Sequence, residues 1–180
     1  MANLIPPDSQ GVEIGTAEGN TAYYILTHLR DVKLYSIDPY FNCPDYVDPF
    51  YAKKEWRQAD SWISLDWCER ESDRKLAPFV ANGRCIRIKK TSKEAVDTFS
   101  NGSLDFVFID ANHRYEYVKE DLASWYPKIK RDGLFSGHDY GHSHHPGIKK
   151  AVDEFAKSRR LRLKIYDDRV WRLISNEIQK

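Results

Sequence analysis

The sequence predicts an α/β fold in which a doubly wound, mostly parallel sheet of seven strands ends in an antiparallel hairpin. Short apolar segments alternate with segments of helical periodicity along most of the 180 residues. Strand–helix alternation of this kind predicts a parallel sheet with helices on both faces. The last two apolar segments, 161–167 and 169–175, are joined so closely that they can only pair antiparallel.

The first two strands are predicted at residues 12–15 and 32–38, with an amphipathic helix between them. The helix has apolar residues at offsets 0, 3, 4 and 7, which are Ala22, Ile25, Leu26 and Leu29. Residues 39–80 then form an insert rich in aromatic residues, and the prolines within residues 39–60 indicate irregular structure there. A helix is expected from Ser61 to Phe79, ended by Pro78 and the Asn82–Gly83 turn.

The second half of the chain continues the alternation. A strand at 85–90 leads into Thr91 and Glu94, which have the spacing of a capping box and predict a short helix through Phe99. Residues 104–111 are almost continuously apolar, as in a strand covered on both faces. The remaining predicted elements are a helix with Val118, Leu122, Trp125 and Ile129 on one stripe, a turn at Asp132–Gly133, a strand at 133–140, and a helix around residues 148–155.

Composition and length narrow the class of protein. We treat residues 1–180 as a single domain, long enough to bury about 70 % of its unfolded surface. A formal net charge of +1 gives no reason to expect nucleic acid as a partner. No segment has the pattern of a signal peptide or of a membrane span. Cys43, Cys68 and Cys85 are widely spaced and form no metal-binding pair, so we expect free thiols and a cytoplasmic location.

The segment GVEIGTAEG, residues 11–19, carries the first functional signal. A strand that breaks into a Gly-rich turn before a helix, and a second strand that ends in an acid, Asp38, form a Rossmann-like nucleoside site. The glycines permit close backbone approach, and the acid can accept hydrogen bonds from ribose hydroxyls. The spacing is not Gly-x-Gly-x-x-Gly, which argues against NAD. Glu13 is an acid inside an apolar strand, so it either binds nearby loop amides or faces a cationic ligand.

Polar residues also follow the other predicted strands, at the edge where such sheets bind ligands. Each could be a helix cap, but their coincidence at one edge indicates a site. Asp110 and Asp139 end two strands expected to be neighbours, and with His138 they form a candidate site for Mg²⁺, Mn²⁺ or Zn²⁺. His138, His142, His144 and His145 lie together in the segment HDYGHSHH. This cluster is either a zinc site or, as we favour, a polar loop near the site.

Three ordered motifs resemble a known family. They read FIDANHRYEYVKEDL (residues 108–122), GLFSGHDY (133–140) and PGIKKAVDEF (146–155). With the Gly-rich turn, they resemble the class I S-adenosylmethionine-dependent methyltransferases, and within them the group that methylates hydroxyls of small molecules. The similarity extends from about Val12 to Ile174.

The resemblance implies roles for individual residues. It implies that a loop surrounds the methionine part of the cofactor, that an acid binds the ribose hydroxyls, and that two residues lie near the adenine. The implied cofactor-binding residues are Glu13, Gly15, Thr16, Gly19, Asp38, Thr91, Ser92 and Asp110. Asp110 would also stand at the boundary with the acceptor. Asp110, His138 and Asp139 would be metal ligands, with His138 where relatives carry a second acid, and His113 would be the general base.

The expected function is therefore methyl transfer from S-adenosylmethionine to a hydroxyl of a small molecule, a sugar or a glycan, with Mg²⁺ or another divalent ion as a candidate assistant. His113, Asp110 and Asp139 are the expected catalytic residues. An NAD-dependent oxidoreductase is disfavoured because the Gly-rich turn lacks the Gly-x-Gly-x-x-Gly spacing. The remaining alternative is a non-catalytic, cofactor-sensing or interaction module. Few residues precede the first strand, so either the aromatic insert or a partner subunit of a homo-oligomer is expected to cover the site.

Overall fold

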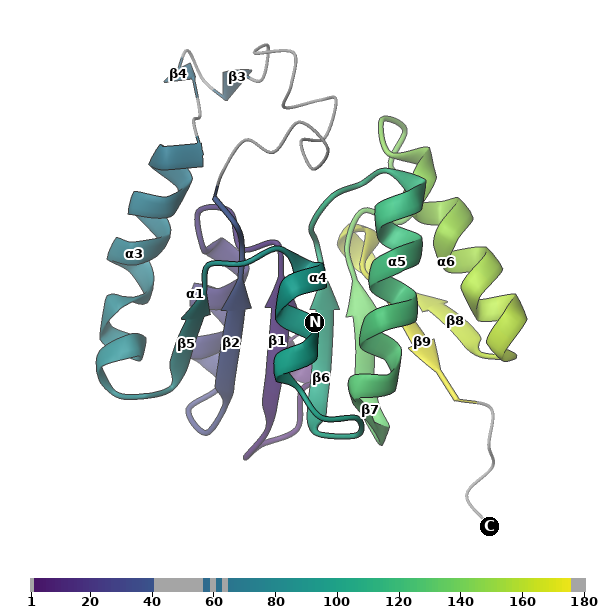
Figure 1. Ribbon diagram of the computed structural model, residues 1–180, viewed down its shortest axis with the longest axis horizontal. Helices are drawn as coiled ribbons and strands as arrows, with labels where there is room; N and C mark the ends of the chain where they lie inside the picture. Colours follow the sequence, from purple (N-terminus) through teal and green to yellow (C-terminus); the bar gives the residue numbers. More distant parts are fainter. Residues whose placement is uncertain (1, 41–56, 59–60, 63–64, 176–180) are drawn as a thin grey trace.

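The computed structural model describes residues 2–40, 57–58, 61–62 and 65–175. Its main sheet has seven strands in the order β5-β2-β1-β6-β7-β9-β8 (Figure 1). The strands of this sheet are β1 (Gln10–Ile14), β2 (Lys33–Ile37), β5 (Cys85–Ile88), β6 (Leu104–Ile109), β7 (Ile129–Gly137), β8 (Arg162–Ile165) and β9 (Trp171–Ile174). The first five pair in parallel, and β9 lies antiparallel between β7 and β8. The predicted fold class is confirmed.

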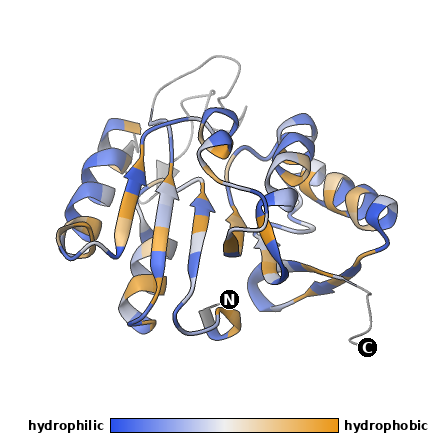
Figure 2. Cartoon of the chain, turned by 60° about the horizontal axis from the view of Figure 1, so that its bottom comes forward, coloured by the Kyte–Doolittle hydropathy of each residue, from blue (hydrophilic) through white to orange (hydrophobic). Residues whose placement is uncertain are grey.

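Helices cover both faces of the sheet. They are α1 (Asn20–His28), α3 (Leu65–Ala81), α4 (Ser92–Ala95), α5 (Tyr115–Trp125) and α6 (Pro146–Arg159). On one face, Ile25 of α1 and Leu76 of α3 pack with Leu34 and Phe106 of the sheet. On the other face, α4, α5 and α6 enclose a second core around Val107, and Figure 2 shows hydrophobic and hydrophilic residues alternating along the helices that flank the sheet. Alternate residues along each strand thus supply the two cores.

Two boundaries differ from the sequence prediction. α3 begins at Leu65, after a short strand pair formed by β3 (Arg57–Gln58) and β4 (Ser61–Trp62), and it continues through Pro78 to Ala81. Pro78 removes one internal hydrogen bond of this helix and stands three residues before its end, so little helix follows it. Most of the rest of the insert at 39–80 lies outside the described residues.

The turn expected at Asp132–Gly133 is also different, because β7 already begins at Ile129. Leu104 pairs with Ile129, but two residues further along β6, Phe106 pairs with Leu134, so the extra residues of β7 form a bulge. An added Cβ at Gly133 would lie 2.9 Å from the carbonyl oxygen of Asp105. Glycine is therefore required there by close packing inside a strand, not by a chain reversal.

The cysteines of the described residues are buried in the fold. Cys68 and Cys85 are buried free thiols, and Cys43 lies outside the described residues. Burial raises the pKa of the Cys85 thiol to about 12, so this group is a packed apolar side chain and not a nucleophile.

Within the described part of the chain, no helix combines the length and the apolar character needed to cross a membrane.

Candidate active site

The carboxyl ends of the five parallel strands meet along one edge of the sheet, which is the upper edge in Figure 1. This edge has two halves. The ends of β1, β2 and β5 carry most of the residues predicted to bind cofactor, and we call them the cofactor half. The ends of β6 and β7 carry the predicted catalytic and metal-binding residues, and we call them the acceptor half. Because β1 and β6 are neighbours, the two halves adjoin at Gly15 and Asp110.

Gly15 is required by packing between the two halves. Its φ of 88° lies in the left-handed region, and a Cβ there would collide with the backbone of Asp110 and Ala111. The absent side chain therefore brings the end of β1 against the end of β6. Gly19 also has a left-handed φ, 78°, and begins α1 against Ser72 of α3.

Asp38 fixes the shape of the Gly-rich turn. Its Oδ2 accepts hydrogen bonds from the backbone N–H groups of Thr16 (3.0 Å) and Ala17 (2.9 Å), and its Oδ1 accepts one from Tyr40 (2.9 Å). Burial raises the pKa of Asp38, although these hydrogen bonds oppose the shift. The acid predicted to bind ribose hydroxyls therefore also holds the loop that would surround the cofactor.

Glu13 is the most deeply buried acid of the cofactor half, with only 1 % of its surface exposed. Burial, followed by the negative charges of Asp110 and Asp38, raises its pKa well above the usual value. Hydrogen bonds from Thr16 and from the backbone of Ala22 act in the opposite direction. Its Oε2 has no hydrogen-bond partner among the described residues. A buried acid of this kind suits a ligand that brings a positive charge.

Thr91 and Ser92 lie where β5 passes into α4, as predicted, and their hydroxyls take part in local structure. Thr91 and Glu94 form the expected capping box. The Ser92 hydroxyl donates to the buried carboxylate of Asp121 and accepts a hydrogen bond from the Trp125 indole N–H (2.8 Å). Their place beside an adenine ring stays a prediction.

In the other half of the edge, His113 lies between two carboxylates. Its Nε2 is 3.4 Å from Oδ2 of Asp139 and 3.9 Å from Oδ1 of Asp110. Asp139 adopts the left-handed conformation with φ 57°, which is uncommon outside glycine and turns the chain sharply after β7. The structure thus brings together the three residues that the sequence identified as catalytic candidates.

His138 lies on the opposite side of Asp139, with its Nδ1 3.3 Å from Oδ1. The hydrogen bond with Asp139 raises the pKa of His138 despite its partial burial. Partial burial pushes the pKa of Asp139 upward, but the hydrogen bond from His138 and the charges of His138, His113 and His145 lower it below the usual value. Ligand atoms of Asp110, His138 and Asp139 all lie within 4.8 Å of one another, so this predicted set could hold a divalent ion.

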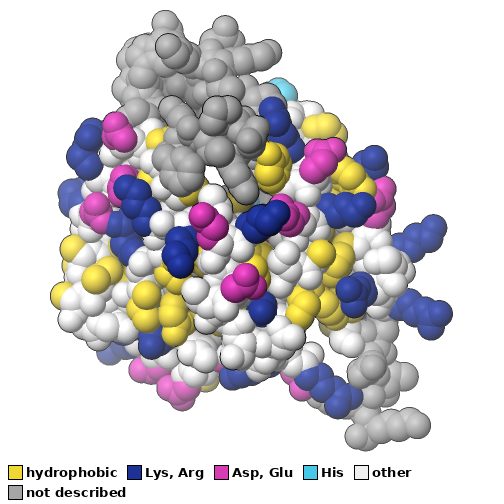
Figure 3. Space-filling model, in the orientation of Figure 1, with side chains coloured by type: hydrophobic (Ala, Val, Ile, Leu, Met, Phe, Trp, Pro, Cys, Tyr) yellow, Lys and Arg dark blue, Asp and Glu magenta, His cyan; other side chains and the backbone are white. Residues whose placement is uncertain are grey.

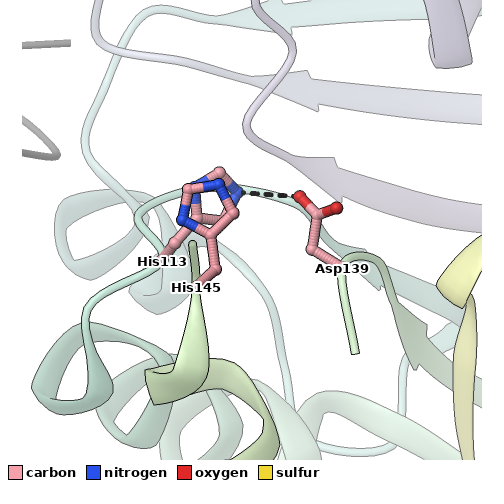
Figure 4. Close-up of side chains that lie close together, drawn as sticks. All are labelled: His113, Asp139 and His145. Atoms are coloured by element: carbon pink, nitrogen blue, oxygen red, sulfur yellow. Dashed lines mark ion pairs between the residues drawn. The ribbon is translucent and has the colours of Figure 1, made fainter. Parts of the chain in front are cut away.

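The sequence prediction missed two residues of this edge. The ring of His145 lies over that of His113, with centroids 4.1 Å apart (Figure 4). The sequence shows that histidines are frequent after residue 137, but it does not show which of them reaches the strand ends. Tyr40 is buried beside Asp38, and its hydroxyl donates to Ser72 (3.0 Å). Because it begins the aromatic insert, nothing in the sequence pattern distinguishes it from its neighbours.

Known protein structures share this fold. The O-methyltransferase NovP superposes with a TM-score of 0.65 at 22 % identity, over 97 % of this chain and 74 % of NovP. A candidate rRNA methylase from Clostridium thermocellum gives 0.63 at 13 % identity, over 97 % and 91 % of the two chains. Spermidine synthase from Thermotoga maritima gives 0.59 at 18 % identity, over 99 % and 57 %. The fold is thus the Rossmann-like fold found in methyltransferases.

Residues 12–140 match the methyltransferase domain family, and the chain belongs to that family. This confirms the resemblance to S-adenosylmethionine-dependent methyltransferases. One curated sequence is also similar, an uncharacterized protein of Sinorhizobium fredii that is 35 % identical over 52 residues. The matched stretch is 29 % of this chain and spans only 6 % of that much longer protein.

Proposed function

We propose that this protein transfers a methyl group from S-adenosylmethionine to a hydroxyl of a small molecule, a sugar or a phenol, with His113 as the general base. The observation that supports this most strongly is the position of His113 Nε2 between the carboxylates of Asp110 and Asp139. An imidazole between two acids at a ligand-binding edge is well suited to accept a proton near neutral pH.

The cofactor half fits a sulfonium cofactor with an amino-acid tail. Bound there, S-adenosylmethionine would supply an activated methyl group. Glu13 would bind the positive charge of the tail, since its buried Oε2 lacks a partner among the described residues. Asp38 holds the turn from Thr16 to Ala17 in place and would offer its remaining lone pairs to the ribose hydroxyls. Gly15 and Gly19 keep side chains out of this turn.

The acceptor half supplies proton transfer and alignment. His113 would take the hydroxyl proton through Nε2 as the oxygen attacks, and Asp139, 3.4 Å away, would stabilise the imidazolium that results. Asp110, at the junction of the halves, would orient the acceptor oxygen. A divalent ion held by Asp110, His138 and Asp139 would lower the pKa of a bound hydroxyl. One imidazole among these donors makes the set less selective for Mg²⁺ than three oxygens would be.

Surface charge favours a small acceptor over RNA. On the face in Figure 3, lysines and arginines alternate with acids, and the formal net charge of the chain is +1. A protein that binds RNA along its backbone concentrates basic residues on one face. Sharing a fold with a candidate rRNA methylase therefore does not by itself imply that this protein methylates RNA.

The experiment that tests this function is methyl transfer from radiolabelled S-adenosylmethionine to a panel of sugars, catechols and a structured RNA, with wild type and His113→Ala in parallel. We expect label in hydroxyl-bearing small molecules and its loss in the variant. Label only in RNA would refute the acceptor class. Cofactor binding without transfer to any acceptor would favour a cofactor-sensing module.

A further inference from the structure

The segment after β7 brings a second histidine to the candidate base. His145 lies just before α6, and its ring is tilted by 34° against that of His113 at a centroid separation of 4.1 Å. Figure 4 shows both rings beside the carboxylate of Asp139, which lies near the start of the same segment as His145. One ligand atom from each of these three residues lies within 4.8 Å of the other two.

The spacing suits a small metal ion. Four ligands around a zinc ion, at bonds of about 2.0–2.1 Å, lie about 3.3 Å apart. His113 Nε2 and Asp139 Oδ2 are already 3.4 Å apart. A ligand atom of His145 lies within 4.8 Å of a ligand atom on each of these two residues, so a rotation of its side chain would bring it to the third corner of a tetrahedron.

The backbone holds the two histidine-bearing segments together independently of their side chains. At Gly147, in the first turn of α6, a Cβ would lie 2.8 Å from the carbonyl oxygen of His113 and 2.6 Å from the nitrogen of Tyr115. The N–H of His145 donates to the carbonyl of His142 (3.0 Å), which fixes the turn before α6. The side chain of His145 does not cap α6, so the helix does not depend on it.

The donor set differs from that of the ion considered above. Asp139 directs Oδ1 toward His138 and Oδ2 toward His113, so the two sets use different oxygens of one carboxylate. Two imidazoles and one carboxylate favour borderline transition ions, whereas Mg²⁺ prefers oxygen ligands and keeps much of its water. With three protein ligands, one coordination position stays open to solvent or to a ligand.

We propose that His113, Asp139 and His145 form a binding site for a divalent transition ion of the zinc class, selective against Mg²⁺. Its consequence for catalysis rests on the proposed function. An ion on Nε2 of His113 occupies the lone pair that would accept the proton of the hydroxyl. Zinc at this site therefore inhibits methyl transfer, and its removal by a chelator restores the reaction.

The test is Zn²⁺ binding to the whole chain, without cofactor or acceptor, by competition with a chromophoric chelator. His145→Ala removes one ligand and leaves His113 and Asp139 in place, and His144→Ala is the matched control because it removes an exposed histidine of the same segment. We expect the Kd for Zn²⁺ to rise at least about 10-fold in His145→Ala and to stay within about 2-fold in His144→Ala. Millimolar Mg²⁺ should not displace the zinc.

Three outcomes would overturn the site. Equal weakening by both variants would mean adventitious binding to surface histidines. Loss of binding in His138→Ala but not in His145→Ala would place the ion on the other donor set. No binding by wild type would refute the site outright. Circular dichroism confirms folding of each variant, and His113→Ala provides a second deletion of a ligand that only this set uses if His145→Ala does not fold. Because no methyl transfer is measured, the result is independent of the proposed reaction.

Discussion

The pKa values of acids are shifted in opposite directions in the cofactor half and the acceptor half of the strand-end edge. In the cofactor half, burial raises the pKa of both Glu13 and Asp38. In the acceptor half, nearby histidines hold the pKa of Asp139 below its usual value and Asp139 raises that of His138. The acids of the first half are thus shifted mainly by burial, although the charge of Arg87 lowers the pKa of Asp38, whereas the carboxylate of Asp139 already has histidines as partners. This difference fits the proposed roles, in which the first half binds a cationic cofactor and the second transfers a proton or holds a metal.

The largest expected effect tests this division in the acceptor half. His113→Ala should lower the rate of methyl transfer to an identified hydroxyl acceptor by about 10²- to 10⁴-fold, because the general base is removed. Affinity for S-adenosylmethionine should change by less than about 3-fold. Single-turnover assays and calorimetry measure the two quantities, with His144→Ala as the control. A rate loss below about 3-fold would reduce His113 to a structural role.

The next largest effect concerns the junction between the halves. Gly15→Ala should strongly destabilise the fold, because its φ of 88° disfavours a side chain and the Cβ would meet the backbone of Asp110. Gly83→Ala is a matched control, since Gly83 has a φ of 78° and no atom within 4 Å of an added Cβ. Denaturant unfolding should show an additional cost of about 1–3 kcal/mol for Gly15→Ala over Gly83→Ala. Equal costs would mean that the halves do not depend on this contact.

A smaller effect tests the charge asymmetry of the cofactor half. Glu13→Gln should weaken S-adenosylmethionine binding by about 10- to 100-fold, through loss of a charged hydrogen bond, while it stabilises the cofactor-free fold by roughly 1–3 kcal/mol. Because the pKa of Glu13 is raised in the folded state, its stabilising protonated form is lost as pH rises through that pKa. The advantage of the variant should therefore grow with pH.

Calorimetry and thermal unfolding of the same samples measure both changes. Glu116→Gln, at an exposed position of α5, is the control for the amide substitution itself. A variant that binds S-adenosylmethionine as well as wild type would show that Glu13 only ties down the turn. That outcome would remove the contrast between the two halves.

The last effect concerns an acid outside both halves. Burial raises the pKa of Asp121 to about 7, although its hydrogen bond from Ser92 lowers it. The stability that this raised pKa provides is complete below the unfolded value of 3.8 and is lost as pH rises toward 7. Relative to Asp121→Asn, wild type should lose at most about 1.4 kcal/mol per pH unit in that interval. If the free energies of unfolding of wild type and Asp121→Asn, measured across this pH interval, do not diverge, the prediction is contradicted.

Much of the fold was predictable because its determinants are local. The capping box at Thr91 and Glu94 needs only residues three apart, and the apolar stripe of α1 needs only one helix. The bulge around Gly133 was not predictable, because it depends on how β7 pairs with β6. Pro78 inside α3 was misjudged for a similar reason, since its cost depends on its place relative to the helix end.

Local patterns in the sequence were enough to predict the order of the strands along the chain, the edge where polar residues gather and the family motifs. How those residues face one another depends on the tertiary structure. It placed His145 rather than His144 beside His113, gave Asp38 to the loop amides and left Oε2 of Glu13 buried. The physical reason is that strand and helix patterns depend on burial repeated every few residues. Contacts between strand ends depend instead on loop geometry and on single left-handed residues such as Gly15 and Asp139.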